Sequence, residues 1–381
     1  MNKENHIYFS GLNGLRFFAA LAVVVTHIEL IKSQYGCENL WKDNKLVFEL
    51  GPMGVIFFFV LSGFLITFLL LKEKEVSGTV AVKKFYLRRI LRIWPLYYLI
   101  TILGFLVLPH IPLIHHSYLG KIMEENFAGN FVLYLLFLPN LAFSMFAAVP
   151  HIGQTWSIGV EEQFYLLWPV ILKYSKKLLN ALIGVIVILI ALKVMVILMY
   201  HANPDSRTLS VVKTFLAMTK MESMAIGGIG AYYLYHHPSK ISLLYNNWLL
   251  ITCIILIPIM VYIFPFRIQD ASYLFYSVLF LIIIINVSCN EKSWIKPENK
   301  IFRMLGDISY GIYMYHLIVV AFVITSLKKS GFTVNNSLQS QIVVYVLCIL
   351  LSVLVSWISF NYFEKWFLKI KSRFAVVKSG S

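Results

Sequence analysis

Residues 50–71 read LGPMGVIFFFVLSGFLITFLLL and contain no charged side chain. A helix needs about 20 apolar residues to cross the roughly 30 Å of hydrocarbon in a bilayer, so this stretch is predicted to be a transmembrane helix. Comparable stretches recur along the chain, with short polar loops between them. The predicted spans are residues 12–31, 50–71, 92–109, 157–174, 178–200, 211–235, 247–264, 272–289, 304–327 and 341–364. The chain is therefore predicted to be an all-α polytopic membrane protein with about ten transmembrane helices.

Composition supports this class. The 381 residues are 59% hydrophobic and 13% charged, whereas about 25% of a soluble domain is charged. The net charge of +15 does not predict a nucleic-acid partner, because the basic residues form short clusters beside apolar segments, as expected for a chain in contact with membrane lipids. The four cysteines show no metal-binding spacing, and no metal site is expected. The first apolar segment lacks a small-residue cleavage site and is expected to be a retained helix.

Orientation follows from the basic residues, which favour the cytoplasmic side of a membrane. With the N-terminus inside, the segments predicted to be cytoplasmic hold 21 Lys and Arg residues and the outer ones hold 8. Both termini, including the basic tail 365–381, are then cytoplasmic, and residues 1–381 form a single domain. A further apolar stretch, 127–147, is interrupted by Pro139 and Asn140. A full crossing there would reverse everything after it, so we expect this stretch to enter from the outer side and return, or to lie along the outer interface.

Ionisable residues inside a membrane are costly, and the first span holds two of them. Arg16 and His27 are eleven residues apart, which is three turns plus about 20°, so they share one face about 16 Å apart along the axis. This pair suits a long substrate whose anionic end lies near Arg16 and whose reactive end lies near His27. An imidazole there can take a proton from a hydroxyl. The alternative is that His27 only forms a hydrogen bond with a neighbouring helix.

The loop after the second span is rich in lysine and arginine, which a topology signal alone can explain. Arg89 and Arg92, however, are three residues apart and share a helix face, and Arg88 precedes them. Guanidinium groups bind phosphates with two parallel hydrogen bonds, so these arginines are candidates for binding a phosphorylated donor.

A third candidate region, residues 154–165, reads QTWSIGVEEQFY. Glu161 and Glu162 point about 100° apart on a helix, so at most one of them faces a cavity. Such a carboxylate can orient His27; alternatively Ser157 caps the helix and both acids interact with its dipole. Further residues are candidates for lining a cavity, and Glu222 is also expected to pair with a basic residue of another helix. These candidates are Trp156, Ser157, Glu162, Gln163, Tyr165, Glu222, Tyr313 and His316.

Five sequence blocks together resemble the membrane acyltransferase 3 family. They are residues 14–17 with His27, 57–66, 85–95, 155–169 and 306–316, in the order of the family. The resemblance implies O-acylation, usually O-acetylation, of cell-surface or exported glycans at a bacterial inner membrane. It implies acetyl-CoA as the cytoplasmic donor substrate, with no bound cofactor, and a carbohydrate or glycolipid acceptor. It also implies a central role for Arg16 and His27, and donor handling by Arg89 and Arg92. The extracytoplasmic hydrolase-like domain of some members is not expected in this chain.

The chain departs from the family pattern before Gly227-Gly228, where Lys220 and Glu222 replace an arginine followed by an acid. The working hypothesis is that His27 is the general base, that Glu161 orients it, and that the arginines hold the donor. Direct transfer and an acyl-histidine relay both fit the residues. The rival classes are a secondary transporter or lipid-linked glycan flippase, and a membrane scaffold. Transporters often contain inverted repeats, and the sequence shows none.

Overall fold

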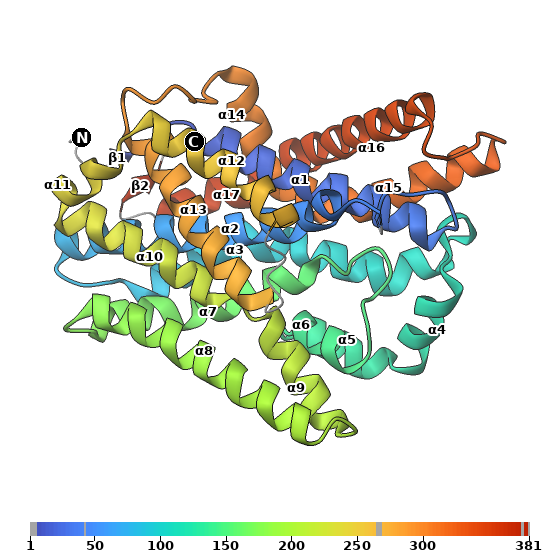
Figure 1. Ribbon diagram of the computed structural model, residues 1–381, viewed down its shortest axis with the longest axis horizontal. Helices are drawn as coiled ribbons and strands as arrows, with labels where there is room; N and C mark the ends of the chain where they lie inside the picture. The colour runs from blue at the N-terminus through green and yellow to red at the C-terminus, as the bar shows by residue number, and fades with distance from the viewer. Residues whose placement is uncertain (1–5, 42, 264–268, 375–376, 380–381) are drawn as a thin grey trace.

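The computed structural model describes residues 6–41, 43–263, 269–374 and 377–379 (Figure 1). The chain is helical apart from two-residue strands β1 (His6–Ile7) and β2 (Lys378–Ser379). The α-helices are α1 (Leu12–Gln34), α2 (Lys45–Ser77), α3 (Val82–Ile102), α4 (Ser117–Glu125), α5 (Phe127–Leu135), α6 (Pro139–Met145), α7 (Thr155–Tyr174), α8 (Leu178–Ala202), α9 (Arg207–Met218), α10 (Met221–His236), α11 (Pro238–Ile241), α12 (Asn247–Ile263), α13 (Gln269–Cys289), α14 (Lys300–Asp307), α15 (Ser309–Lys329), α16 (Leu338–Ser359) and α17 (Lys365–Lys371). Short 3₁₀ and π turns connect them: Leu103–Val107, Leu108–His110, Pro112–Ile114, Ser242–Leu244, Phe360–Glu364 and Ser372–Phe374.

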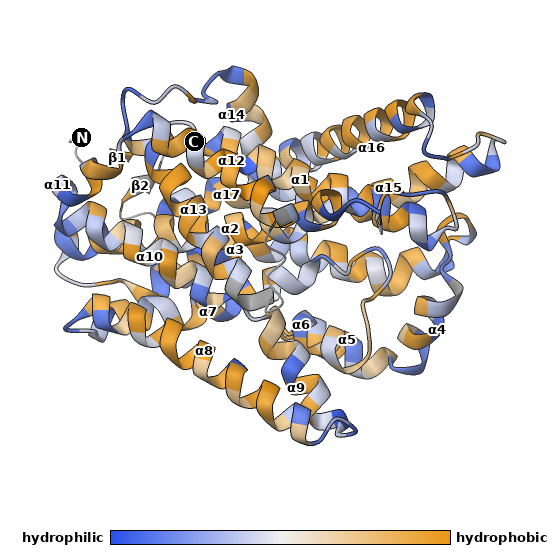
Figure 2. Cartoon of the chain, in the orientation of Figure 1, coloured by the Kyte–Doolittle hydropathy of each residue, from blue (hydrophilic) through white to orange (hydrophobic). Residues whose placement is uncertain are grey.

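The two chain ends lie at the same end of the molecule, which we call the terminal end. His6 and Ile7 of β1 pair in parallel with Lys378 and Ser379 of β2 (Figure 1). The opposite end, with the loop between α15 and α16, is called the far end. Placement of both chain ends on one side agrees with an even number of membrane crossings. Figure 2 shows hydrophobic residues along helices such as α8 and α16, and hydrophilic residues gathered in the loops at both ends.

The all-α, multi-pass architecture predicted from the sequence is confirmed, but the number of ten spans is not. In the described part of the chain, seven helices are long and apolar enough to cross a membrane. They cover residues 12–34, 45–77, 82–110, 178–202, 272–289, 309–329 and 338–374. An eighth span results if residues 238–244 and 247–262, which are bent by 63°, are taken together. Residue 264, the predicted end of one span, lies outside the described residues.

Two predicted spans account for most of the difference. Residues 157–174 form α7, which carries Glu161, Glu162 and Lys173 and is too polar to be counted. Residues 211–235 do not form one helix, because the chain breaks at Thr219 and Lys220 between α9 and α10. The Lys193 Nζ of α8 lies 2.6 Å from Glu222 Oε1 beside this break, and both side chains are buried. The predicted cross-helix pair of Glu222 is therefore confirmed.

The stretch 127–147 turns back instead of crossing, as the sequence predicts. It forms α5 and α6, and the chain reverses around Phe137, which has a φ of 57°. The Tyr97 hydroxyl of α3 donates to the carbonyl of Tyr134 at 2.8 Å, so α5 ends beside the middle of α3. After α6 the chain returns toward the far end, where His151 Nε2 lies 2.9 Å from the carbonyl oxygen of Ile114.

The core of the bundle is built around α1, which packs against α2 and α15, and α2 packs most extensively against α10. Two glycines permit this last contact. A Cβ atom at Gly63 would overlap the carbonyl oxygen of Met224, and one at Gly227 would overlap that of Val60. Small residues allow two helices in a membrane to approach this closely. The close contact fixes α2, and therefore Ser62 beside Gly63, against the rest of the bundle.

Candidate functional site

A cavity of about 220 Å³ opens in the half of the molecule nearer the terminal end. Its polar lining comes mainly from six helices that are far apart in sequence. These residues are Asn13 and Arg16 of α1, Ser62 of α2, Arg89 and Arg92 of α3, Ser157, Glu161 and Tyr165 of α7, Ser309, Tyr310 and Tyr313 of α15, and Lys371 of α17. Apolar residues of α2 and of the segment before α1 complete the walls. The cavity therefore combines a group of cations with a hydrophobic wall, as a substrate with a charged end and an apolar arm would require.

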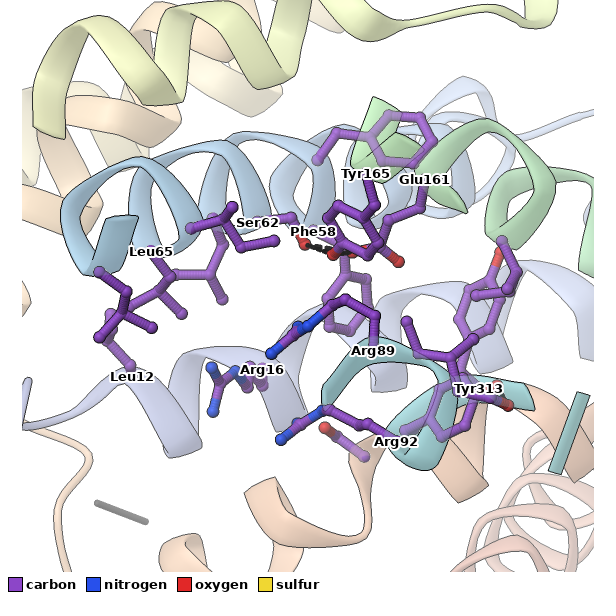
Figure 3. Close-up of a pocket in the computed structure, with 18 of the residues that line it drawn as sticks. Leu12, Arg16, Phe58, Ser62, Leu65, Arg89, Arg92, Glu161, Tyr165 and Tyr313 are labelled. Carbon is purple, nitrogen blue, oxygen red and sulfur yellow. Dashed lines mark hydrogen bonds between the residues drawn. The ribbon is translucent and has the colours of Figure 1, made fainter. Parts of the chain in front are cut away.

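Three predicted arginines meet in this cavity. Figure 3 shows Arg16, Arg89 and Arg92 pointing into the same space from two helices. Arg16 Nη1 donates to Asn13 Oδ1 at 3.0 Å. None of the three forms an ion pair with a carboxylate in the described part of the chain. Arg89 Nε is buried and, among the described residues, has no hydrogen-bond partner. Guanidinium groups in this state are suited to an anionic ligand.

Arg88 does not belong to this group, and its predicted role in donor binding is not supported by the geometry. Its Nη2 forms an ion pair with Glu73 Oε2 at 2.8 Å, and its Nη1 donates to the carbonyl of Phe374 at 3.0 Å. It is not among the residues that line the cavity. Adjacent positions on a helix point about 100° apart, so Arg88 faces α2 and the C-terminal segment while Arg89 faces the cavity.

The adjacent acids also separate. Glu161 lines the cavity and accepts hydrogen bonds from the hydroxyls of Ser62 and Tyr165 (Figure 3). Tyr165 Oη lies 3.1 Å from Ser62 Oγ, so the three side chains form a closed set. Glu162 points away and accepts a hydrogen bond from Trp94 Nε1 at 2.9 Å. As the helix geometry requires, only one of the two carboxylates faces the cavity.

His27 has a different partner from the one predicted. Its Nδ1 lies 2.9 Å from Nε2 of His316, whereas Glu161 is bonded to Ser62 and Tyr165. The predicted contact in which Glu161 orients His27 is therefore replaced by an imidazole pair. Neither histidine is among the residues that line the cavity, but Tyr313, one helical turn before His316, is.

The protonation of this pair follows from its contacts when both rings are neutral. His316 Nδ1 lies 2.7 Å from the carbonyl oxygen of Tyr313. A carbonyl can only accept, so Nδ1 of His316 carries the hydrogen and its Nε2 is an acceptor. His27 Nδ1 must then donate to it, which leaves a lone pair on Nε2 of His27. The geometry thus fixes the tautomer in which His27 has a basic nitrogen available.

The other predicted residues also divide into those that line the cavity and those that do not. Ser157 Oγ lies 2.6 Å from the Tyr313 hydroxyl, and both residues line the cavity. Trp156 packs edge-on against Phe59, and Gln163 donates to Asn140 Oδ1 at 2.9 Å. Neither of these two, nor Glu162, Glu222 or His316, lines the cavity. Within the described residues no group of His, Cys, Asp and Glu side chains could hold a metal ion.

Five of the twelve polar cavity residues named above are not among the predicted site residues: Asn13, Ser62, Ser309, Tyr310 and Lys371. Ser62 is an uncharged residue in an apolar span and gave no signal, although it lies within the block 57–66. Lys371 was assigned with the rest of the basic tail to membrane orientation. Its contact with the cavity depends on α17 packing against α3, which the sequence does not show.

Residues 9–360 match the sequence model of a family described as an acyltransferase domain. A Staphylococcus aureus protein named as an O-acetyltransferase is 27% identical over 95% of this chain and 58% of its own length. The peptidoglycan O-acetyltransferase OatA of Listeria monocytogenes is 27% identical over 82% of this chain and 49% of its own length. The chain spans about half the length of the curated relatives it matches. No solved structure matches it. By the extent of the family match, the chain belongs to the family of membrane acyltransferase domains.

Proposed function

We propose that this chain is a membrane-bound O-acyltransferase that moves an acyl group, in the simplest case acetyl, from acyl-CoA to a hydroxyl of a surface carbohydrate. Its location would be a bacterial cytoplasmic (inner) membrane, with the terminal end facing the cytoplasm. The names of the Listeria relative and of a related Bacillus subtilis protein, both of which refer to peptidoglycan O-acetylation, support a glycan acceptor. Acyl-CoA is here a substrate, and the reaction proposed needs no resident cofactor.

The observation that carries this proposal is the cavity with three guanidinium groups that form no ion pair within the described residues. Coenzyme A ends in a nucleotide with several phosphates, which are strong ligands for arginine. Its other end is an uncharged arm that bears the thioester, and the apolar wall of the cavity suits such an arm. Arg16 lies about 16 Å below His27 along α1, so a donor bound at Arg16 can extend toward the imidazole pair.

The chemistry proposed at His27 is general base catalysis. Nε2 of His27 takes the proton from the acceptor hydroxyl as its oxygen attacks the thioester carbonyl. The new C–O bond forms, the C–S bond breaks, and the leaving thiolate takes the proton back from His27. His316 acts as a positioning residue: it accepts the Nδ1 hydrogen of His27, holds the tautomer, and strengthens this bond when His27 becomes charged.

The test uses the full chain in lipid nanodiscs with acetyl-CoA and soluble peptidoglycan fragments. The wild type is expected to release coenzyme A in an acceptor-dependent reaction and to acetylate the glycan. His27→Ala should lower turnover by roughly 10² to 10⁴ while binding of coenzyme A persists. His236→Ala, which removes an exposed imidazole outside the cavity, is the matched control. His316→Gln, which keeps an acceptor, should retain more turnover than His316→Phe.

Two outcomes would overturn the proposal. A folded wild type that neither binds coenzyme A nor shows turnover with a range of glycan acceptors would favour a transporter or flippase. Full turnover in His27→Ala would remove the assigned base. Accumulation of labelled acetyl on His27 in the absence of acceptor would replace direct transfer by a histidine relay.

A further inference from the structure

The C-terminal segment contributes a side chain to the cavity. Lys371, the last residue of α17, lines it together with Arg16, Arg89 and Arg92. The segment is attached to the bundle at several places. α17 packs against α3, Arg88 donates to the carbonyl of Phe374, and β2 pairs with β1. Lys371 is therefore held at the cavity by contacts that the segment makes on both sides of it.

The charges around the cavity are unbalanced. Lys371 and the three arginines are near enough to repel one another electrostatically. None of the four forms an ion pair with a carboxylate in the described part of the chain. Glu161, the carboxylate that lines the cavity, already accepts from two hydroxyls. Asp307 is near enough to attract Arg16 and Arg92, and Glu161 to attract Arg92, which offsets part of this repulsion. The four cations still outnumber the nearby acids, so an anion between them would favour the docked lysine.

We propose that Lys371 is a fourth cation of the donor site and that binding of the donor phosphates clamps the C-terminal segment against α3. The inference rests on the proposed function for the identity of the donor. The arginines on α1 and α3 present planar donors from the core of the bundle, whereas lysine is a point charge on a flexible stem. A lysine on a terminal segment can close onto a phosphate that the arginines have already bound.

The clamp has a reciprocal consequence. If the phosphates stabilise the docked segment, the docked segment must raise the affinity for the phosphates by the same factor. The segment before α1 takes part as well, because Ile7, Tyr8 and Phe9 line the same cavity and Ile7 belongs to the strand that pairs with β2. The two ends of the chain therefore border the donor site that we propose they help to close.

The experiment compares Lys371→Gln with Lys369→Gln in the full chain in nanodiscs. Lys369 lies on the same short helix, is exposed and does not line the cavity, so the two variants lose the same charge. Calorimetric titration with coenzyme A is expected to show a 5- to 20-fold weaker affinity for Lys371→Gln, and less than a twofold change for Lys369→Gln. The Lys371→Gln variant should also lose part of the salt dependence of binding. Pantetheine, which lacks the phosphates, should bind both variants equally.

Hydrogen exchange provides the second measurement. Coenzyme A should slow amide exchange in residues 365–374 of the wild type and of Lys369→Gln, and slow it less in Lys371→Gln. If coenzyme A binds the wild type and Lys371→Gln equally, or leaves this exchange unchanged, the clamp is refuted and the proposed function stands. If the wild type does not bind coenzyme A, the donor assignment fails, and inorganic pyrophosphate becomes the probe. Equal pyrophosphate affinities of the wild type and Lys371→Gln would refute the clamp, and no binding of pyrophosphate would refute the anion site as well.

Discussion

Two groups of cations inside this protein lie in different regions and differ in their partners. Outside the cavity two buried lysines have a carboxylate partner: Lys32 lies 3.0 Å from Glu29 Oε1 at the far end of α1, and Lys193 lies 2.6 Å from Glu222 Oε1. Inside the cavity Arg16, Arg89, Arg92 and Lys371 have none in the described part of the chain. The two lysines are buried and paired within the fold, whereas the four cavity cations are partly exposed and form no ion pair in the described residues.

Cations that have a carboxylate partner and cations that have none should contribute differently to folding stability and to ligand binding. A charge taken out of water costs several kcal/mol, and a partner of opposite charge offsets this cost. Removing one member of a pair leaves the other as an isolated charge. Removing an unpaired cation instead relieves repulsion. The paired group should therefore be needed for folding, and the unpaired group should be needed for a ligand.

The largest expected effect is on Lys32. Lys32→Met leaves the buried Glu29 carboxylate without its ammonium, although it still accepts from the Tyr345 hydroxyl and the Leu40 amide. The free energy of unfolding, measured by denaturant titration in detergent, should fall by about 3–5 kcal/mol. Lys329→Met changes an exposed lysine at the same end and is the control. A loss below about 1 kcal/mol in Lys32→Met would show that the pair is not what stabilises this end.

A buried side chain with one unpartnered nitrogen also occurs outside the cavity, but it is uncharged. His151, in the loop between α6 and α7, is buried with its Nδ1 unpartnered among the described residues. Burial lowers its pKa to about 4 from the ordinary 6.5, and the nearby His116 acts in the same direction. The unfolded chain therefore binds a proton at a pH where the folded protein does not. Stability contributed by the neutral ring is complete above pH 6.5 and is lost as the pH falls toward 4.

This predicts a loss of about 2 kcal/mol by pH 5 that His151→Gln does not share. The variant keeps an amide that can donate to the Ile114 carbonyl but cannot be protonated. Unfolding of both proteins in nanodiscs would be followed from pH 7.5 to pH 5. Parallel pH profiles of the two proteins would show that His151 carries no such penalty.

Much of this organisation is visible in the sequence because it is local or periodic. Apolar length predicts the long helices, the interruption at Pro139 and Asn140 agrees with the turn between α5 and α6, and helix periodicity places Arg89 and Arg92 on one face. The number of spans was less accessible. The break between α9 and α10 lies beside the buried pair of Lys193 and Glu222, and the contact of α10 with α8 that forms this pair is not encoded locally.

The site was predictable where one helix carries it and not where several helices meet. Arg89 and Arg92, which share one face of α3, both line the cavity with Arg16. The contact of His27 with His316, however, depends on the register of α1 against α15. The contact of Lys371 depends on how α17 returns to α3. Arg88 belongs to the same basic cluster, but its guanidinium pairs with Glu73 and does not line the cavity.

Arg88 and Arg92 give the finest test of the comparison, because they lie one turn apart on α3 and differ in having a partner. Arg92→Gln removes an unpaired cation, so the melting temperature should stay the same or rise, while affinity for coenzyme A should fall about 10- to 100-fold. Arg88→Gln breaks the pair with Glu73, so unfolding should become easier by roughly 2 kcal/mol, with affinity changed less than threefold. Calorimetric titration and thermal unfolding of both variants measure the two effects. The opposite result would be that Arg92→Gln is the less stable variant and Arg88→Gln the weaker binder. The division between the two groups of cations would then be wrong, because Arg88 would bind the ligand and Arg92 would stabilise the fold.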